Sequence, residues 1–184
     1  MLVTGRYRPS PVVRVASTGY LTMHINPDHF LQTEAGRVTT RARNNEAWRE
    51  SYRAFHQALA DAGPDSKVYV LVGAQGSGKS TWAAQVARGH PSAIIFDAIL
   101  VTHRERCPIL AATEARGLKA IAVWFKTPLS VCLVRNAARP HDEIVPEVGI
   151  RNVFAAIEPP SRLEGFDEVI EIQSGDSGSI ALEP

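Results

Sequence analysis

The feature that most constrains the fold of this chain is the glycine-rich segment Gly73-Ala74-Gln75-Gly76-Ser77-Gly78-Lys79-Ser80-Thr81. It matches the pattern G-x-x-x-x-G-K-[ST], in which glycines let backbone N–H groups turn inward around phosphate oxygens. A continuous apolar run at residues 68–72 precedes it, as in a strand buried on both faces. A helical pattern follows at residues 78–88, and the N-terminus of a helix favours an anion. The segment therefore predicts a phosphate-binding loop between a buried strand and a helix.

Two side chains of this loop suit the phosphates of ATP and their magnesium ion. Lys79 carries the positive charge expected opposite the β- and γ-phosphates, and Ser80 supplies a hydroxyl oxygen. Oxygen is the ligand that Mg²⁺ prefers, so Ser80 is a candidate metal ligand. We therefore expect residues 73–81 to bind ATP and Mg²⁺. The alternative is a glycine-rich turn that binds no ligand.

The rest of residues 67–173 alternates between strand and helix patterns. Apolar runs typical of buried strands recur at residues 93–96, 120–125 and 169–172. Helices are expected within residues 102–116, after Thr127-Pro128 with Thr127 as cap, and after Val145-Pro146. Pro108 is expected to make the first of these helices restart near Cys107. This alternation predicts an α/β domain with a parallel sheet flanked by helices, followed by a flexible tail at residues 174–184.

Residues 1–66 are interpreted as an N-terminal extension made of a short hairpin and a helix. The hairpin would pair residues 12–15 with residues 20–25, across a turn at Ser17-Thr18-Gly19. The helix would begin at Asn45 as its cap and stop at Gly63-Pro64. Its large apolar residues form one packing stripe, Trp48, Tyr52, Phe55 and Leu59.

Three further residues are candidates for the chemistry of the loop. Asp97 ends the strand at residues 93–96, and the carboxyl ends of parallel strands open onto the ligand crevice. Asp97 could therefore accept a proton from an acceptor or bind a water of the Mg²⁺ shell. Arg135 and Arg139 lie four residues apart and share a helix face. The segment Pro140-His141-Asp142-Glu143 follows them, so both arginines could close over the γ-phosphate as part of a flap.

These motifs resemble the kinase domain of polynucleotide 5′-hydroxyl kinases over roughly residues 68–172. The resemblance is carried by LVGAQGSGKSTW, FDAILVTHRER, AVWFKTPLSVCLVRNAARP, the pair Val145-Pro146 and IEPPSRLEGFDEVIEI, in that order. It implies a P-loop NTPase fold and transfer of the ATP γ-phosphate to a 5′-OH end of a nucleic acid. By the same resemblance, Gly76, Gly78, Lys79, Ser80 and Thr81 bind ATP–Mg²⁺, while Arg135 and Arg139 match the lid arginines.

The acceptor side of the chain departs from that family. The family has an Asp-x-x-Arg motif after the loop helix, whose aspartate is the general base, and this segment is missing here. Asp97 instead matches a later Asp-x-Thr-Asn motif, with Ile99 and Leu100 in place of its threonine and asparagine. Three explanations stay open. Asp97 serves as base for a different or smaller acceptor, residues 1–66 supply the lost strand and acceptor groups, or the protein binds nucleotide without transferring phosphate.

Other acids and bases offer weaker candidates for the missing proton acceptor. His103 is a spare base, but a surface histidine is the favoured interpretation. The acids available in the extension are Asp28, Glu34, Glu46 and Glu50. Arg37, Arg41 and Arg43 lie in a polar stretch that fits either a basic arm for nucleic acid or a solvated linker.

Composition says more about where the protein is located than about which substrate it uses. The net charge is +1, so no global field favours nucleic acid or membrane. No apolar run is long enough to cross a membrane, and the two cysteines form no disulfide framework, which suits a cytoplasmic protein. The sequence thus predicts an ATP-dependent kinase acting on a hydroxyl group. The alternatives are a non-catalytic nucleotide-binding module and a small-molecule kinase, and the oligomeric state stays open.

Overall fold

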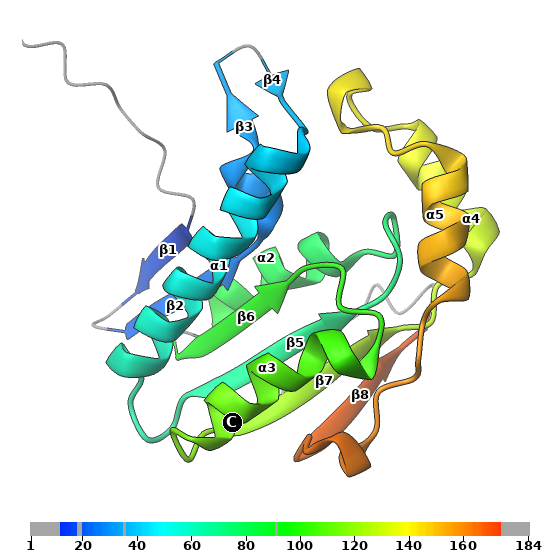
Figure 1. Cartoon of the computed structure of the whole chain (residues 1–184). Coiled ribbons are helices and arrows are strands. Elements are labelled where there is room, and N and C mark those ends of the chain that lie inside the picture. Colours follow the sequence, from blue (N-terminus) through cyan, green and yellow to red (C-terminus); the bar gives the residue numbers. More distant parts are fainter. Residues whose placement is uncertain (1–11, 18–19, 35, 91, 174–184) are drawn as a thin grey trace, which may run out of the picture.

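The computed structural model describes residues 12–17, 20–34, 36–90 and 92–173. Its main feature is one six-stranded sheet in the order β1-β2-β6-β5-β7-β8 (Figure 1). Five of these strands run parallel, and β1 is antiparallel to β2. The strands are β1 (Val12–Ser17), β2 (Tyr20–Ile25), β5 (Lys67–Val72), β6 (Ala93–Asp97), β7 (Lys119–Phe125) and β8 (Glu168–Ile172). The predicted α/β architecture with a parallel sheet flanked by helices is confirmed.

Helices cover both faces of the sheet. Their bounds are α1 (Arg41–Asp61), α2 (Lys79–Gly89), α3 (His103–Glu114), α4 (Leu129–Ala137) and α5 (Glu147–Ala155). Figure 1 shows α1 and α3 on one face and α2 on the other, with α4 and α5 side by side near one end. None of the helices within the described ranges is long and apolar enough to span a membrane.

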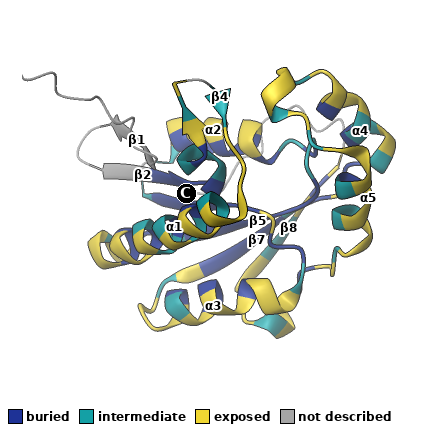
Figure 2. Ribbon diagram, turned by 45° about the horizontal axis from the view of Figure 1, so that its top comes forward, coloured by how far each residue is buried: buried dark blue, intermediate teal, exposed yellow. Residues whose placement is uncertain are grey.

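The alternation of side chains along β5 divides the core into two layers. Val68 and Val70 point into the layer that α1 and α3 cover, whereas Tyr69 and Leu71 pack against α2. All four side chains are almost fully buried, as expected for a central parallel strand. Figure 2 shows the same pattern in the middle of the sheet, where β5 and β7 are mostly buried between helices whose outer faces are exposed. Because β5 is packed on both faces, the position of its carboxyl end, where the glycine-rich segment begins, is well defined.

The N-terminal strands belong to the same sheet as the rest of the chain. The predicted hairpin is an antiparallel pair, with Val12 opposite Ile25 and Ser17 opposite Tyr20, while Thr18 and Gly19 of its turn lie outside the described residues. β2 also pairs in parallel with β6, where Ile25 is opposite Phe96. The extension therefore supplies a strand beside β6. Such a strand is needed if residues 1–66 are to replace the segment that is missing after the loop helix.

The helix of the extension starts earlier than its sequence predicts. Asn45 is not the cap, because Thr40 has extended backbone angles and its Oγ1 accepts the N–H of Arg43 at 3.2 Å. Arg41 and Arg43 consequently lie in the first turn of α1 and not in an unstructured polar stretch. The predicted packing stripe is confirmed: Phe55 and Leu59 are buried, and Trp48 and Tyr52 pack against the same cluster.

Two predictions about prolines and caps were wrong. α3 does not restart at Cys107 but continues through Pro108, which lies on the exposed face, where solvent can reach the carbonyl that a proline leaves unbonded. Thr102 caps α3 in a capping box with Glu105. Thr127 does not cap α4; Pro128 is the cap residue, and the Thr127 hydroxyl instead donates to the Ser77 carbonyl at 2.9 Å. The predicted tail, residues 174–184, lies outside the described residues.

Two short strands complete the N-terminal region. β3 (Gln32–Thr33) and β4 (Gly36–Arg37) form a separate antiparallel pair after the 3-10 helix η1 (Pro27–Phe30). This pair reaches the segment after α4, because the Arg37 N–H donates to Asp142 Oδ2 at 3.0 Å. Residues 105 positions apart in the sequence thus meet near the carboxyl end of the sheet.

Candidate functional site

The glycine-rich loop, residues 73–81, connects β5 to α2 as predicted. Gly76 and Gly78 have φ values of +78° and +107°, in the left-handed region that favours glycine. A Cβ on Gly76 would lie 2.5 Å from the carbonyl oxygen of Cys132 in α4, so a side chain has no room there. The loop therefore needs these glycines both for its backbone turn and for its close packing on α4.

Lys79 is the first residue of α2 and points back into the loop. Its Nζ donates to the carbonyl oxygens of Gly73 at 2.8 Å and Ala74 at 3.0 Å. Burial lowers the pKa of Lys79 from its ordinary value, and the negative charge of Asp97 opposes that shift. Because these hydrogen bonds go to neutral carbonyls, the loop holds a buried cation that an anionic ligand would stabilise.

Asp97 is buried at the end of β6, and three side chains converge on its Oδ2. Ser80 Oγ donates to it at 2.7 Å, Asn26 Nδ2 donates at 3.1 Å, and His24 Nε2 lies 3.2 Å away. Burial alone would raise the pKa of Asp97, but the hydrogen bond with His24 and the charge of Lys79 outweigh it and hold that pKa below its ordinary value. Asp97 is therefore an ionised carboxylate next to the Ser80 hydroxyl, and these are the two candidate metal ligands.

His24 and Asn26 are site residues that the sequence did not reveal. His24 belongs to β2 and Asn26 directly follows it, and the pairing of β2 with β6 brings both side chains to Asp97. His24 lies inside a strand pattern and Asn26 directly after it, and no local pattern identifies the neighbour of that strand in the sheet.

The two predicted lid arginines lie near the same loop. Arg135, in the last turn of α4, is exposed, and its Nη1 donates to the Gly76 carbonyl at 3.4 Å. Arg139 lies beyond the end of α4, so the prediction that it shares a helix face with Arg135 was wrong, although both arginines line the same cavity. The next residues form a short 3-10 helix, η2 (His141–Glu143), which includes the Asp142 that accepts from the Arg37 N–H. The lid segment and the N-terminal β3–β4 pair therefore touch across the opening of the site.

One cavity of about 1230 Å³ collects most of the predicted site residues. Its lining includes residues 75–81 of the loop, Asp97, Arg135 and Arg139. Gly73 and Ala74 do not line it but hold Lys79 through their carbonyls. The extension contributes Asn26, Asp28, Arg37 and Trp48 to the same wall. A cavity of this size can accommodate a nucleotide together with a second ligand.

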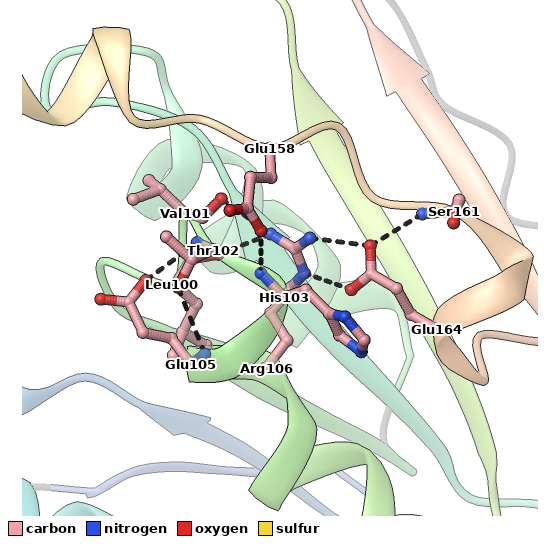
Figure 3. A network of polar contacts seen from close by, with 9 residues as sticks. All are labelled: Leu100, Val101, Thr102, His103, Glu105, Arg106, Glu158, Ser161 and Glu164. Atoms are coloured by element: carbon pink, nitrogen blue, oxygen red, sulfur yellow. Dashed lines mark hydrogen bonds and ion pairs between the residues drawn. The ribbon is translucent and has the colours of Figure 1, made fainter.

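A neighbouring network fixes the loop after β6, and of the residues drawn in Figure 3 only Glu105 also lines the cavity. Arg106 is fully buried, and its guanidinium forms two hydrogen bonds of 2.7 Å with the carboxylate of Glu164. It also donates to the carbonyls of Leu100 and Val101. Glu158 accepts the backbone N–H of His103 at 2.6 Å. His103, the spare base, is exposed and does not line the cavity, so its position favours a structural role.

Within the described ranges, no group of three or more His, Cys, Asp and Glu residues could hold a metal ion. The pair formed by Ser80 and Asp97 is of a different type, since Mg²⁺ at phosphate sites uses one or two protein oxygens together with phosphates and waters. In comparisons with known proteins, no family model matches this chain, and no curated protein is significantly similar to it.

Proposed function

We propose that this chain is a P-loop phosphotransferase that binds Mg²⁺–ATP at residues 73–81 and transfers the γ-phosphoryl group to a hydroxyl acceptor. The observation that carries the proposal is the convergence of Lys79, the Ser80–Asp97 hydrogen bond and two arginines on one cavity. Phosphoryl transfer depends on positioning and charge neutralisation, and these groups supply both.

The loop is suited to phosphate by its backbone and by its buried polar atoms. Lys79 has its ammonium inside the loop, where it would exchange carbonyl oxygens for phosphate oxygens. The Ser77 Oγ is buried and has no hydrogen-bond partner among the described residues. A hydroxyl in that position can donate to an anion, and an unmade hydrogen bond costs about 1–3 kcal/mol. Phosphate binding would therefore satisfy a group that the free protein leaves unbonded.

Ser80 and Asp97 fit a magnesium ion better than Asp97 fits a general base. When bound, Mg²⁺ would neutralise charge on the β- and γ-phosphates. Asp97 has its Oδ2 occupied by three neighbours and its pKa held below the ordinary value, both of which weaken a carboxylate as a proton acceptor. It stays ionised and orients the Ser80 hydroxyl. Of the two roles predicted for Asp97, we therefore favour the one at the metal.

Arg135 and Arg139 are proposed to neutralise the transferred phosphoryl group. Arg135 is exposed but already contacts the loop carbonyl of Gly76, so a short movement brings its guanidinium to a phosphate in the loop. Guanidinium groups suit this task because they stay charged and bind phosphate oxygens in pairs. Charge of this kind acts mainly on the transition state.

The acceptor is a 5′-OH end of a nucleic acid or a small hydroxyl compound. One observation favours the small compound: of the three arginines that could form a basic arm, only Arg37 lines the cavity, and it forms an ion pair with Asp28. Arg41 and Arg43 belong to the first turn of α1 and do not line the cavity. A long anionic strand would need free cations along its path.

Transfer from γ-labelled ATP tests the proposed function. The protein is incubated with Mg²⁺ and labelled ATP, together with either a 5′-OH oligonucleotide or a panel of small alcohols and sugars. Label in an acceptor supports the kinase, and the acceptor that takes it decides between the two classes. Intact ATP binding with no labelled product from any acceptor would instead support a nucleotide-binding module without transferase activity.

A further inference from the structure

The end of β2 brings a second carboxylate to the cavity, separate from Asp97. β2 runs parallel to β6, and their last paired residues are Ile25 and Phe96. The chain then continues through Asn26 and Pro27 to Asp28 at the start of η1. Asp28 therefore lies at the same edge of the sheet as the glycine-rich loop and lines the same cavity.

Contacts with neighbouring residues hold Asp28 in a defined position. Asn26 Oδ1 accepts the backbone N–H of Asp28 at 2.9 Å, while Asn26 Nδ2 donates to Asp97 Oδ2 at 3.1 Å. One amide side chain thus connects the two aspartates. On the other side, the Arg37 guanidinium forms an ion pair with Asp28 Oδ1. The Arg37 side chain is 13% exposed and that of Asp28 is 50% exposed, so a largely buried cation presents an accessible carboxylate.

The charge of Asp28 also affects the pKa of the loop lysine. Burial lowers the pKa of Lys79, and the charge of Asp28 is one of the effects that oppose the shift. Asp28 is thus close enough to influence the loop lysine without forming an ion pair with it.

The other acidic residues that line the cavity have other hydrogen-bond partners or lie in other segments. Asp97 has three neighbours on one oxygen, Glu105 accepts the Thr102 N–H in the capping box of α3, and Asp142 accepts the Arg37 N–H. Glu143 also lines the cavity but belongs to η2, in the segment that follows α4. Asp28 differs from Glu143 because it is anchored both to the end of a sheet strand and to a largely buried arginine.

We propose that Asp28 is the catalytic residue that accepts the proton of the acceptor hydroxyl, which rests on the proposed phosphotransferase function. The acceptor oxygen forms a bond to the γ-phosphorus, and the bond from that phosphorus to the β–γ bridging oxygen breaks. ADP leaves with that electron pair. The hydroxyl proton passes to the Asp28 carboxylate and from there to solvent. Arg37 and Asn26 act as positioning residues that hold the carboxylate toward the acceptor.

The test compares Asp28→Asn with Glu34→Gln, an exposed acid of the same segment that does not line the cavity. Transfer is followed with γ-labelled ATP and whichever acceptor the wild-type protein uses, and ATP hydrolysis is followed as the reaction with water as acceptor. Asp28→Asn should lower the transfer rate by about 10²–10⁴-fold, the usual contribution of a positioned base. Its affinity for Mg²⁺–ATP should stay within about twofold of the wild type, since a removed base changes the chemical step and not nucleotide binding. Glu34→Gln should change neither.

Two further variants keep the test decisive. Asp28→Glu retains the carboxylate and should transfer faster than Asp28→Asn, whereas a purely structural defect would affect both. A transfer rate for Asp28→Asn within a few-fold of the wild type would overturn the proposal, as would a comparable loss in Glu143→Gln. A different result is expected if the protein is not a phosphotransferase at all. The wild-type protein would then neither transfer nor hydrolyse the γ-phosphate, and this result would also overturn the role of Asp28.

Discussion

Asp97→Asn offers a quantitative test of how the site is built. The substitution keeps the shape of the side chain and removes the charge that Ser80, Asn26 and His24 contact on Oδ2. A hydrogen bond to a charged group contributes about 1 kcal/mol more than a neutral one, so three such contacts give a destabilisation of about 3 kcal/mol. With a urea m-value of about 2 kcal/mol/M, the unfolding midpoint should fall by about 1.5 M.

The pH dependence of this effect has a definite sign. The pKa of Asp97 in the folded protein lies below the ordinary value of 3.8. The stability that the ionised carboxylate contributes is therefore fully present at pH 7 and is lost as the pH falls below 3.8 through the folded-state pKa. The difference between wild type and Asp97→Asn should shrink over that acidic range.

Urea unfolding followed by circular dichroism measures both effects. Asp65→Asn is the matched control, because Asp65 is exposed and lies outside the cavity. It should leave the midpoint nearly unchanged. If Asp97→Asn unfolds at the same urea concentration as the wild type at pH 7, the contacts on Oδ2 do not carry the charge-dependent energy inferred from them. Because Asp97 is also assigned to the metal, Mg²⁺–ATP affinity should fall in the same variant.

Further predictions concern the lid and the buried ion pair. Arg135→Ala and Arg139→Ala should each lower turnover far more than ATP affinity, as measured by steady-state transfer kinetics and calorimetry. If turnover and ATP affinity fell by the same factor, the arginines would have no special role in the transition state. Glu164→Gln should destabilise the fold by about 3–5 kcal/mol, because it leaves the buried Arg106 guanidinium without its counter-charge. Glu171→Gln, which removes an exposed ion pair with Lys126, is the control and should lower the free energy of unfolding by less than about 1 kcal/mol. Thermal unfolding measures both variants, and similar losses of stability would contradict this account of the buried ion pair.

The parts of the site that the sequence predicts well are those built from contiguous residues. The loop of residues 73–81 follows a buried strand and opens a helix, and each of these patterns is local. Asp97 is predictable because it directly ends a strand, and parallel strands expose their carboxyl ends at one edge. Arg135 and Arg139 both line the cavity, but they do not share the helix face that their spacing predicts, because α4 ends at Ala137.

The parts that the sequence does not predict depend on which elements become neighbours. His24 and Asn26 reach Asp97 only because β2 pairs with β6, and no local periodicity encodes the order of strands in a sheet. The ion pair between Arg106 and Glu164 joins residues 58 positions apart for the same reason. The cap of α1 illustrates a smaller ambiguity, since Thr40 and Asn45 both have suitable side chains and only the backbone angles at Thr40 decide between them.

Titration calorimetry of Mg²⁺–ATP tests the central claim most directly. The wild-type protein should bind one nucleotide per chain, and Lys79→Ala should weaken binding by at least about tenfold, because it removes a charge-assisted hydrogen bond to phosphate worth about 1.5–3 kcal/mol. Lys119→Ala, an exposed lysine at the start of β7 that does not line the cavity, should bind as the wild type does. Absence of binding to the wild-type protein, or equal affinity in Lys79→Ala, would contradict the assignment of residues 73–81 as a nucleotide site.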